Sequence, residues 1–214
     1  MKSLLISAAF CLALGGCASS KGKAHFYKEG FQAPDIVAVL PPDNESNDLA
    51  AGDTYRRVMA TALVALGYFP LASPAQEAAL EKMGVSDGGQ LAGFKPQDIA
   101  ENLGTQGLLY GKVEEFNDLN TGIYRSRKAQ FVSYLTDAKG EKLWQAWGMG
   151  VDRKISQNIA ASLAEGLATK MVQKMLRTHL LAEASTAGRE MMQKIPEWPE
   201  PSAAKIRAIK KDLK

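Results

Sequence analysis

The fold is decided by residues 36–71, which read IVAVLPPDNESNDLAAGDTYRRVMATALVALGYFPL. Residues 36–40 form a short, continuous apolar run that ends at Pro41 and Pro42, and such a run is typical of a central strand buried on both faces. Residues 68–71 have the composition of a second strand, and Pro70 favours the edge of a sheet or a bulge. Strands that are joined through a helix are parallel, so this segment predicts the start of an α/β sheet.

The helix between these strands has the strongest periodic signal in the sequence. Its apolar residues recur at i, i+3, i+4, i+7, i+8 and i+11, which is one face of a helix with 3.6 residues per turn. They are Tyr55, Val58, Met59, Ala62, Leu63 and Leu66. Asp53 is placed to cap the start of this helix, and Gly67 is placed to end it.

The chain continues with two helices and then with three strands. Ser73 and Pro74 open a helix to about residue 83, and the glycine-rich residues 85–94 are expected to form a mobile loop. A short helix over residues 96–103 precedes a strand over 108–116. Two further strands, 127–136 and 141–151, form a hairpin around the turn 137–140. Trp144 and Trp147 lie three residues apart in one of these strands, so they are expected to face opposite sides.

A long amphipathic helix over residues 157–181 is expected to follow the hairpin. One apolar ridge holds Ala160, Leu163, Leu167 and Met171, and Ala168, Val172, Leu176 and Leu180 lie beside it. The predicted order is therefore β-α-β-α-α-β-β-β-α. Because the early strands are parallel and the hairpin is antiparallel, the sequence predicts a single mixed β-sheet with helices packed on it, an α/β fold with α+β character.

The first 16 residues have the pattern of a signal peptide, with Lys2 before the apolar residues 4–14. Eleven helical residues span roughly 16 Å, about half of a bilayer core, so this segment is too short for a transmembrane anchor. Residues 14–17 read LGGC and resemble the bacterial lipoprotein box. That resemblance implies cleavage before Cys17 and attachment of lipid to it, and the alternative is an ordinary signal peptide with an incidental cysteine.

The resemblance to lipoproteins also implies a location. Ala18, rather than Asp, follows the cysteine, and by the usual sorting rule this favours anchoring in the outer membrane, with the protein facing the periplasm. Residues 17–34 have no sustained period and are expected to be a lipid-anchored tether. The globular domain is expected over residues 35–183. Residues 184–214 are expected to form a helical extension, a break at three prolines, and a basic tail.

Composition excludes several classes of function. The chain has 214 residues, of which 46% are hydrophobic and 23% charged, the balance of a globular protein. Its formal charge of +3 is too small for a dedicated nucleic-acid binder. The 2 Cys, Cys11 and Cys17, both lie near the start, and the 2 His are His25 and His179. We therefore expect no disulfide framework, no metal site and no cofactor.

Catalytic motifs are also missing from the sequence. No Gly-x-Ser-x-Gly elbow is present, and His179 is expected to pack at the edge of the core rather than to catalyse, so no enzymatic activity is predicted. Asp43 and Asn44 form a candidate ligand loop, because open α/β sheets bind ligands beyond the carboxyl ends of their strands. The alternative is structural, since Asp and Asn also favour turns and helix caps.

Several segments resemble a known family. They are VAVLPPDN, ALGY, ENLGTQGLLYGKVEEF, Thr136-Asp137, Gly140 and Leu143-Trp144. Together they resemble a family of proteobacterial surface lipoproteins that includes a meningococcal vaccine-candidate lipoprotein, over roughly residues 10–185 of the chain. The layout is more distantly similar to the periplasmic domain of the curli secretion channel lipoprotein and to the amino-terminal domain of the Tol–Pal translocation protein. The resemblance implies an outer-membrane α/β lipoprotein with a role in envelope transport or assembly.

Three functions remain open at the level of sequence. The first is a non-catalytic envelope component that binds a periplasmic or outer-membrane protein, or copies of itself. The second is a module close to peptidoglycan or another glycan, which the basic tail favours, although no aromatic platform is evident. The third is an enzyme, which the missing nucleophiles, bases and metal ligands disfavour.

Overall fold

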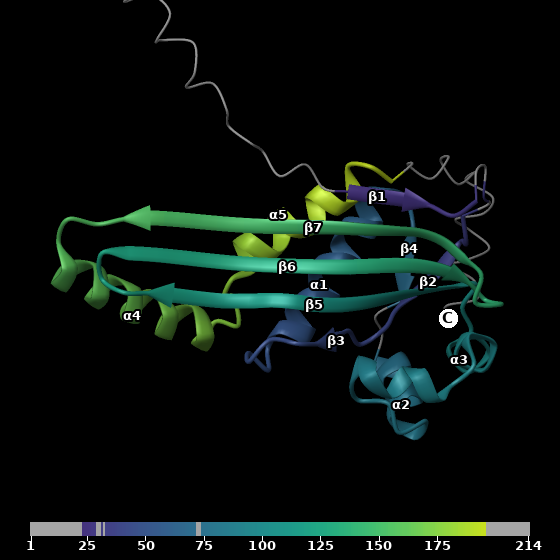
Figure 1. Ribbon diagram of the computed structural model, residues 1–214. Helices are drawn as coiled ribbons and strands as arrows, with labels where there is room; N and C mark the ends of the chain where they lie inside the picture. The colour runs from purple at the N-terminus through teal and green to yellow at the C-terminus, as the bar shows by residue number, and fades with distance from the viewer. Residues whose placement is uncertain (1–22, 29–30, 32, 72–73, 196–214) are drawn as a thin grey trace, which may run out of the picture.

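The structure, a computed structural model, describes residues 23–28, 31, 33–71 and 74–195. The predicted signal peptide, Cys17 and the basic tail lie outside these residues. The described strands form one seven-stranded sheet with the order β1-β7-β6-β5-β2-β4, and β3 pairs with β5 beside this path (Figure 1). The strands are β1 (Lys23–Phe26), β2 (Ile36–Val39), β3 (Asp43–Asn44), β4 (Phe69–Leu71), β5 (Gly107–Asn120), β6 (Tyr124–Asp137) and β7 (Lys142–Ile155).

The sheet is mixed, as the sequence predicts. Strand β2 is parallel to β4 and to β5, whereas β5, β6 and β7 follow one another in antiparallel hairpins. Strand β4, with Pro70, lies at one edge of the sheet, which confirms the expectation from that proline. Strand β1 lies at the other edge, antiparallel to β7.

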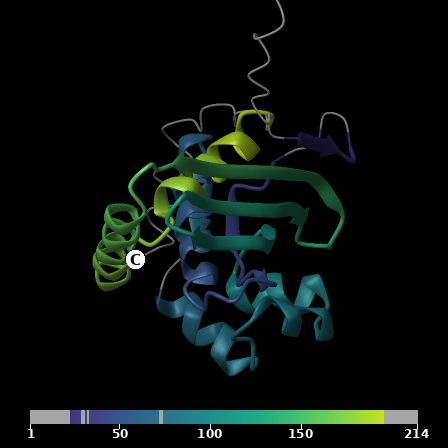
Figure 2. The ribbon, with the colours of Figure 1, turned by 60° about the vertical axis from the view of Figure 1, so that its left-hand side comes forward.

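Helices cover the two faces of the sheet unequally. They are α1 (Ala51–Ala65), α2 (Pro74–Lys82), the 3₁₀ helix η1 (Gly88–Gly93), α3 (Pro96–Leu103), α4 (Ile159–Met175) and α5 (Leu181–Met192). Helices α1 and α5 pack behind the sheet, whereas α2, η1 and α3 pack on the opposite face of β2 and β5. Figure 2 shows that α4 stands apart from both groups, at the far end of the long strands.

Two hydrophobic clusters result from the alternation of side chains along the central strands. Val37 and Val39 of β2 contact the α1 and α5 side, while Ala38 and Leu40 contact the α2 and α3 side. On α1, Tyr55, Val58, Met59 and Leu63 are buried, so the predicted phase of this helix is confirmed. Trp144 is fully buried and Trp147 is half-buried, on opposite faces of β7 as predicted.

Residues 23–26, expected to belong to the tether, are instead part of the sheet. They form β1, with Lys23 opposite Trp147 and Phe26 opposite Trp144. Their period is too short to see in the sequence, because an edge strand of four residues gives only two residues per face. Consequently only residues 18–22 separate Cys17 from the sheet.

Residues 85–94, expected to be a mobile loop, contain the 3₁₀ helix η1. Asp87 accepts a hydrogen bond from the Gly89 N–H at 2.8 Å, and the Gln90 side chain accepts one from the Asp87 N–H at 3.1 Å. This is a capping box, which satisfies the free amides at the start of the helix. Leu91 is buried in the hydrophobic cluster beneath this helix, so the glycine-rich segment forms a packed turn.

The predicted long helix over residues 157–181 is divided in two. Helix α4 ends at Met175, and Arg177 and Leu180 have positive φ angles of 53° and 52° before α5 begins. Helix α5 was expected to be an extension of the domain, yet Ala184, Ala187 and Met191 belong to the main core. The described globular unit therefore continues to Ile195, which is also buried.

Candidate functional site

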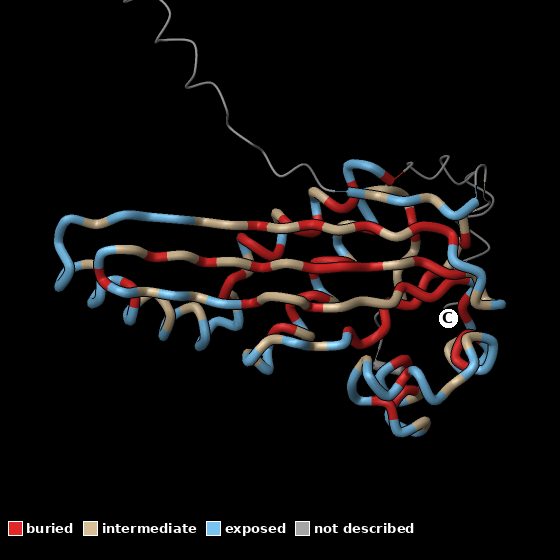
Figure 3. Tube along the Cα trace, in the orientation of Figure 1, coloured by how far each residue is buried: buried red, intermediate tan, exposed pale blue. Residues whose placement is uncertain are grey.

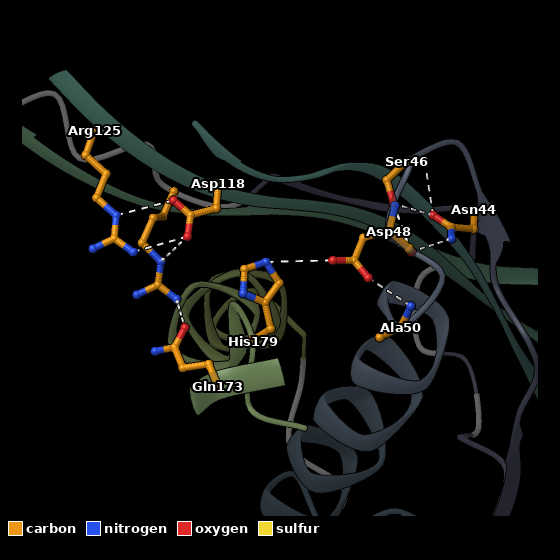
Figure 4. Close-up of polar contacts among 9 residues, drawn as sticks. Asn44, Ser46, Asp48, Ala50, Asp118, Arg125, Gln173 and His179 are labelled. Carbon is orange, nitrogen blue, oxygen red and sulfur yellow. Dashed lines mark hydrogen bonds and ion pairs between the residues drawn. The ribbon is translucent and has the colours of Figure 1, made fainter. Parts of the chain in front are cut away.

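The loop before α1 holds Asn44 and Asp48 in a tight arrangement of hydrogen bonds. The Asn44 side-chain amide donates to the Asp48 carbonyl at 3.0 Å, and its oxygen accepts from the Ser46 N–H and hydroxyl at 3.0 and 2.7 Å (Figure 4). Asp48 then accepts from the Ala50 N–H at 3.0 Å. Asn44, a candidate ligand residue, thus stabilises the turn that leads into α1. This is the structural role that the sequence offered as the alternative to ligand binding.

Asp53 does not cap α1, contrary to the prediction. The N-cap residue is Ala50, without a side-chain capping bond, and Asp53 lies in the first turn of the helix. There its carboxylate interacts favourably with the positive end of the helix dipole.

Asp43, the other candidate ligand residue, lines a cavity of about 560 Å³ between η1 and the open face of the sheet. Tyr110 and Tyr134, directly opposite each other on β5 and β6, form its floor with stacked rings whose centroids are 4.8 Å apart. The Lys142 ammonium lies 4.7 Å from the Tyr134 ring centroid, a cation–π distance. Thr136, 2% exposed, also lines the cavity, and its hydroxyl has no hydrogen-bond partner.

Burial, with a smaller contribution from the neighbouring Tyr134, raises the pKa of Tyr110 to about 12. Burial also raises the pKa of Tyr134. Both phenols are therefore neutral hydrogen-bond donors at physiological pH. The cavity thus combines hydroxyl groups and an ammonium group beside two aromatic rings, which suits a polar ligand with several oxygen acceptors.

His179 lies between α4 and α5 and is only 6% exposed. Its Nε2 is 3.7 Å from an Asp48 carboxylate oxygen, its ring meets Phe116 edge-on, and its Nδ1 has no hydrogen-bond partner. Burial lowers the pKa of His179, while Asp48 and Asp118 oppose that change and Lys170 and Lys174 add to it. The expected role in packing at the core edge is confirmed.

A layer of buried charges lies behind the far ends of β5 and β6. Asp118 accepts a two-pronged hydrogen bond from the Arg125 guanidinium, at 3.3 and 3.1 Å (Figure 4). Arg127 lies 3.8 Å from the same carboxylate and 3.2 Å from Glu183 of α5, and it donates to Gln173 of α4 at 2.8 Å. The four charged side chains, Asp118, Arg125, Arg127 and Glu183, are at most 10% exposed. The layer therefore ties α4 and α5 to the long strands by polar contacts.

Helix α4 turns its small and polar side toward that layer. Gly166 is the one buried residue of this helix, and a Cβ atom there would overlap the Asn120 amide. Asn120 also donates to the Ser162 carbonyl at 3.1 Å. The helix side that contacts the body is thus Ser162, Gly166, Thr169 and Gln173, each one of them buried or half-buried.

Most of the apolar side of α4 faces away from the molecule, contrary to the expectation that its ridges would be buried; only Ile159 and Leu163, at the start of the helix, also lie against Gly122 of the β5–β6 turn. Large apolar side chains between residues 159 and 176 are 39–78% exposed: Ile159, Leu163, Leu167, Met171, Val172, Met175 and Leu176. Ala160, Ala164 and Ala168 between them are also exposed, and Figure 3 shows the helix mostly in the exposed colour. Of the two predicted ridges, only Leu180, beyond the helix, is fully buried.

Within the described residues, no group of three or more His, Cys, Asp or Glu side chains is arranged to hold a metal ion. No helix in that part of the chain is long and apolar enough to cross a bilayer.

A comparison with protein families matches residues 27–197 to the family described as "Putative lipoprotein GNA1162-like". The chain belongs to this GNA1162-like lipoprotein family. The resemblance to surface lipoproteins is thereby confirmed. A comparison with curated proteins found no match.

Solved structures resemble this GNA1162-like chain in fold. Lipoprotein GNA1162 from Neisseria meningitidis is 22% identical with a TM-score of 0.50, over 67% of this chain and 99% of that one. A PelC dodecamer from Paraburkholderia phytofirmans is 16% identical with a TM-score of 0.44, over 79% of this chain and 98% of that one. The LpoB C-terminal domain from Salmonella enterica is 24% identical with a TM-score of 0.41, over 56% and 85%.

Sequence reasoning missed the most exposed feature of this GNA1162-like protein. Its periodicity located the apolar ridges of α4, yet the ridges were assumed to face the core. The signal that could have corrected this is the opposite side of the same helix, where Ser162, Gly166 and Thr169 are small or polar and suit a close approach to a polar layer. The second signal is Asp118, Arg125 and Arg127 on facing strands, which place charge where a core face was expected.

Proposed function

We propose that this chain is a non-catalytic, outer-membrane-anchored lipoprotein that faces the periplasm and acts in envelope transport or assembly by binding protein. Membership of a lipoprotein family supports the anchored, envelope-associated part of this proposal. The part of the proposal that concerns protein binding rests on one observation, the exposed apolar side of α4. Large exposed apolar patches on soluble domains mark sites of protein contact.

The anchor on Cys17 would hold the domain close to the membrane. Because β1 begins at Lys23, residues 18–22 are the whole spacer, with a maximum reach of roughly 20 Å. Three acyl chains at about 0.8 kcal/mol per buried methylene would make the attachment lasting. Strand β1 is separated from β5, which α4 contacts, by β7 and β6. The apolar side of α4 would therefore be available to a partner in the periplasm.

The anchor is tested with Cys17→Ala. We expect the precursor to stay uncut and the protein to leave the outer-membrane fraction. The matched control is Cys11→Ala, because Phe10 before that cysteine does not fit the lipoprotein box. Normal processing and outer-membrane fractionation of Cys17→Ala would contradict the lipid assignment.

The interaction is tested by placing a photoreactive residue at Leu167 in living cells. Leu167 is 64% exposed on α4, so the substitution should not disturb the fold. A crosslink to a protein is expected, whereas the same residue at Ser185, exposed on α5, should give none. Equal yields at the two positions, or no protein crosslink at Leu167, would count against α4 as the binding surface.

A module for glycans remains the second candidate, because the Tyr110–Tyr134 cavity brings two phenol hydroxyls and an ammonium group together. Tyr134 stacks on Tyr110 and has Lys142 over its ring, so these groups would hold a sugar by hydrogen bonds, and the ammonium suits an acidic substituent. We expect the protein to sediment with isolated peptidoglycan and Tyr134→Ala to weaken this. Tyr124→Ala, at the opposite end of β6, is the control. Equal sedimentation of both variants and the wild type would exclude the cavity as a glycan site.

A further inference from the structure

We infer that the apolar side of α4 binds the same side of α4 in a second copy of this chain. The inference rests on the proposed function, since it names the partner of the same surface. Leu163, Leu167, Met171 and Met175 are spaced by four residues and form a continuous ridge of large side chains. Ala160, Ala164 and Ala168 form a shallow row directly beside that ridge.

A ridge beside a groove makes this surface complementary to itself. Helices commonly pack by placing the ridge of residues four apart into the corresponding groove of the partner. One α4 presents both parts at once, so a two-fold axis near the centre of the helix would place each ridge in the other groove. Such an interface is isologous, with the same patch on both copies. A different partner would need to supply this complementarity independently.

The exposed area is that of a small interface between two copies. A fully exposed large aliphatic side chain carries roughly 100 Å² of apolar surface, so the ridge and Val172 beside it expose about 300 Å² per copy. Interfaces are about 57–65% apolar, so this corresponds to roughly 450–550 Å² per partner. A pair of copies then buries about 1,000 Å² in total, the size at which specific interfaces begin.

Charges border this surface but do not interrupt it. On an α-helix of 100° per residue, Glu165 falls far from Leu167, whereas Lys170 and Lys174 form the row directly beside the ridge. Their long side chains can keep the ammonium groups in water while a second helix approaches along the ridge. The polar side, with Gly166 and Gln173, is already occupied by the body of the same chain.

The test uses the full lipoprotein in isolated cell envelopes, with Leu167→Cys and a mild oxidant. Leu167 lies near the centre of the ridge, so its two copies should meet and form a disulfide-linked dimer. Cys17, where lipid is expected, would be blocked, and Ser185→Cys on α5 is the exposed control.

Adding Met171→Glu to Leu167→Cys should reduce the yield of the disulfide-linked dimer about tenfold or more, because it places charge in the ridge. Met171 is 72% exposed, so the melting temperature should not change.

The outcomes separate this inference from the proposed function. A dimer from Leu167→Cys that Met171→Glu suppresses supports pairing of α4 helices. If Leu167 crosslinks only to a different envelope protein, the pairing is overturned while the proposed function stands. If a photoreactive group at Leu167 labels lipid and no protein, both are overturned. An equal dimer yield from Ser185→Cys would also overturn the pairing, because it would indicate random collision.

Discussion

Leu63 shows how one side chain reports the phase of a helix. It is fully buried on α1, in the main core, whereas Thr61 on the same helix is exposed and its hydroxyl donates to the Arg57 carbonyl at 2.9 Å. A residue at the centre of the buried stripe contributes to stability through its burial and through close packing. A residue off the stripe contributes little to stability in either way.

We expect Leu63→Ala to lower the free energy of unfolding by about 2–5 kcal/mol, because apolar burial is lost and a cavity is left. Thr61→Ala should change it by no more than roughly 0.5 kcal/mol. Chemical denaturation of both variants measures the difference. Similar losses at the two positions would show that the helix packs with another face.

His179 is the second residue whose environment gives a measurable effect. Burial lowers its pKa in the folded chain, so between that value and the unfolded pKa near 6.5 the unfolded chain binds more protons. Stability must then fall as the pH drops below about 6.5, until the folded pKa is passed. Asp48 on the loop before α1 and Asp118 on β5 moderate the effect, whereas Lys170 and Lys174 on α4 increase it.

We therefore expect His179→Phe to flatten the dependence of unfolding free energy on pH in the range just below about 6.5. The measurement is a series of denaturant titrations across that range for the variant and the wild type. The absolute stability of the variant is not the criterion, because the new ring also changes packing. An unchanged slope would mean that His179 is not the group that titrates there.

At the scale of elements, the sequence predicted α1, α3 and the parallel start of the sheet because each has a local signal. The stripe through Leu63 defines α1, Pro96 and Gly104 bound α3, and residues 36–40 are apolar throughout. The lengths of β5 to β7 were underestimated, since their far ends bear polar side chains that no core would require. These side chains pair with one another across the strands, with Glu183 of α5, and with Gln173 of α4.

The orientation of α4 could not be predicted from periodicity. A hydrophobic stripe identifies the apolar side of a helix, but it does not identify what that side contacts. Here the sheet beneath α4 presents Asp118 and Arg127, so the polar side of the helix is the one that fits. The roles of the two residues in the candidate ligand loop could not be predicted either. The Asn44 side chain makes hydrogen bonds within its own loop, whereas Asp43 lines the cavity because β3 pairs with β5.

The buried charges under α4 give the prediction at this scale. Asp118→Ala removes the carboxylate that Arg125 and Arg127 share, and both guanidinium groups would stay buried. We expect a loss of about 3–5 kcal/mol in unfolding free energy, as for other buried pairs that lose one partner. Lys28→Ala, which breaks the exposed contact with Glu141, should cost less than about 1 kcal/mol. Comparable effects of the two substitutions in thermal unfolding would contradict a structural role for this layer.

At the scale of the whole molecule, the sheet separates two kinds of surface. Strand β1 holds the amino-terminal side of the domain at one sheet edge, close to the position expected for the membrane anchor. The far ends of β5, β6 and β7 extend past α1 and α5 and support α4 (Figure 1). An anchored domain with this shape would present its apolar helix away from the edge that the lipid holds. The arrangement explains why α4 can be apolar on its outer side without contacting its own core.

The carboxyl-terminal segment provides the last prediction. Ile195 is buried in the core, and after it come Pro196, Pro199 and Pro201. Residues 202–214 then include Lys205, Arg207, Lys210, Lys211 and Lys214, with Asp212 as the acidic residue. Since burial of so many cations would remove hydration that little could replace, we expect deletion of residues 202–214 to leave the melting temperature unchanged. The deletion should weaken recovery of the crosslinked partner mostly at low salt, because charge contacts are screened beyond about 8 Å at physiological ionic strength. A much lower melting temperature would place the segment in the fold, and recovery unaffected at every salt concentration would exclude it from binding.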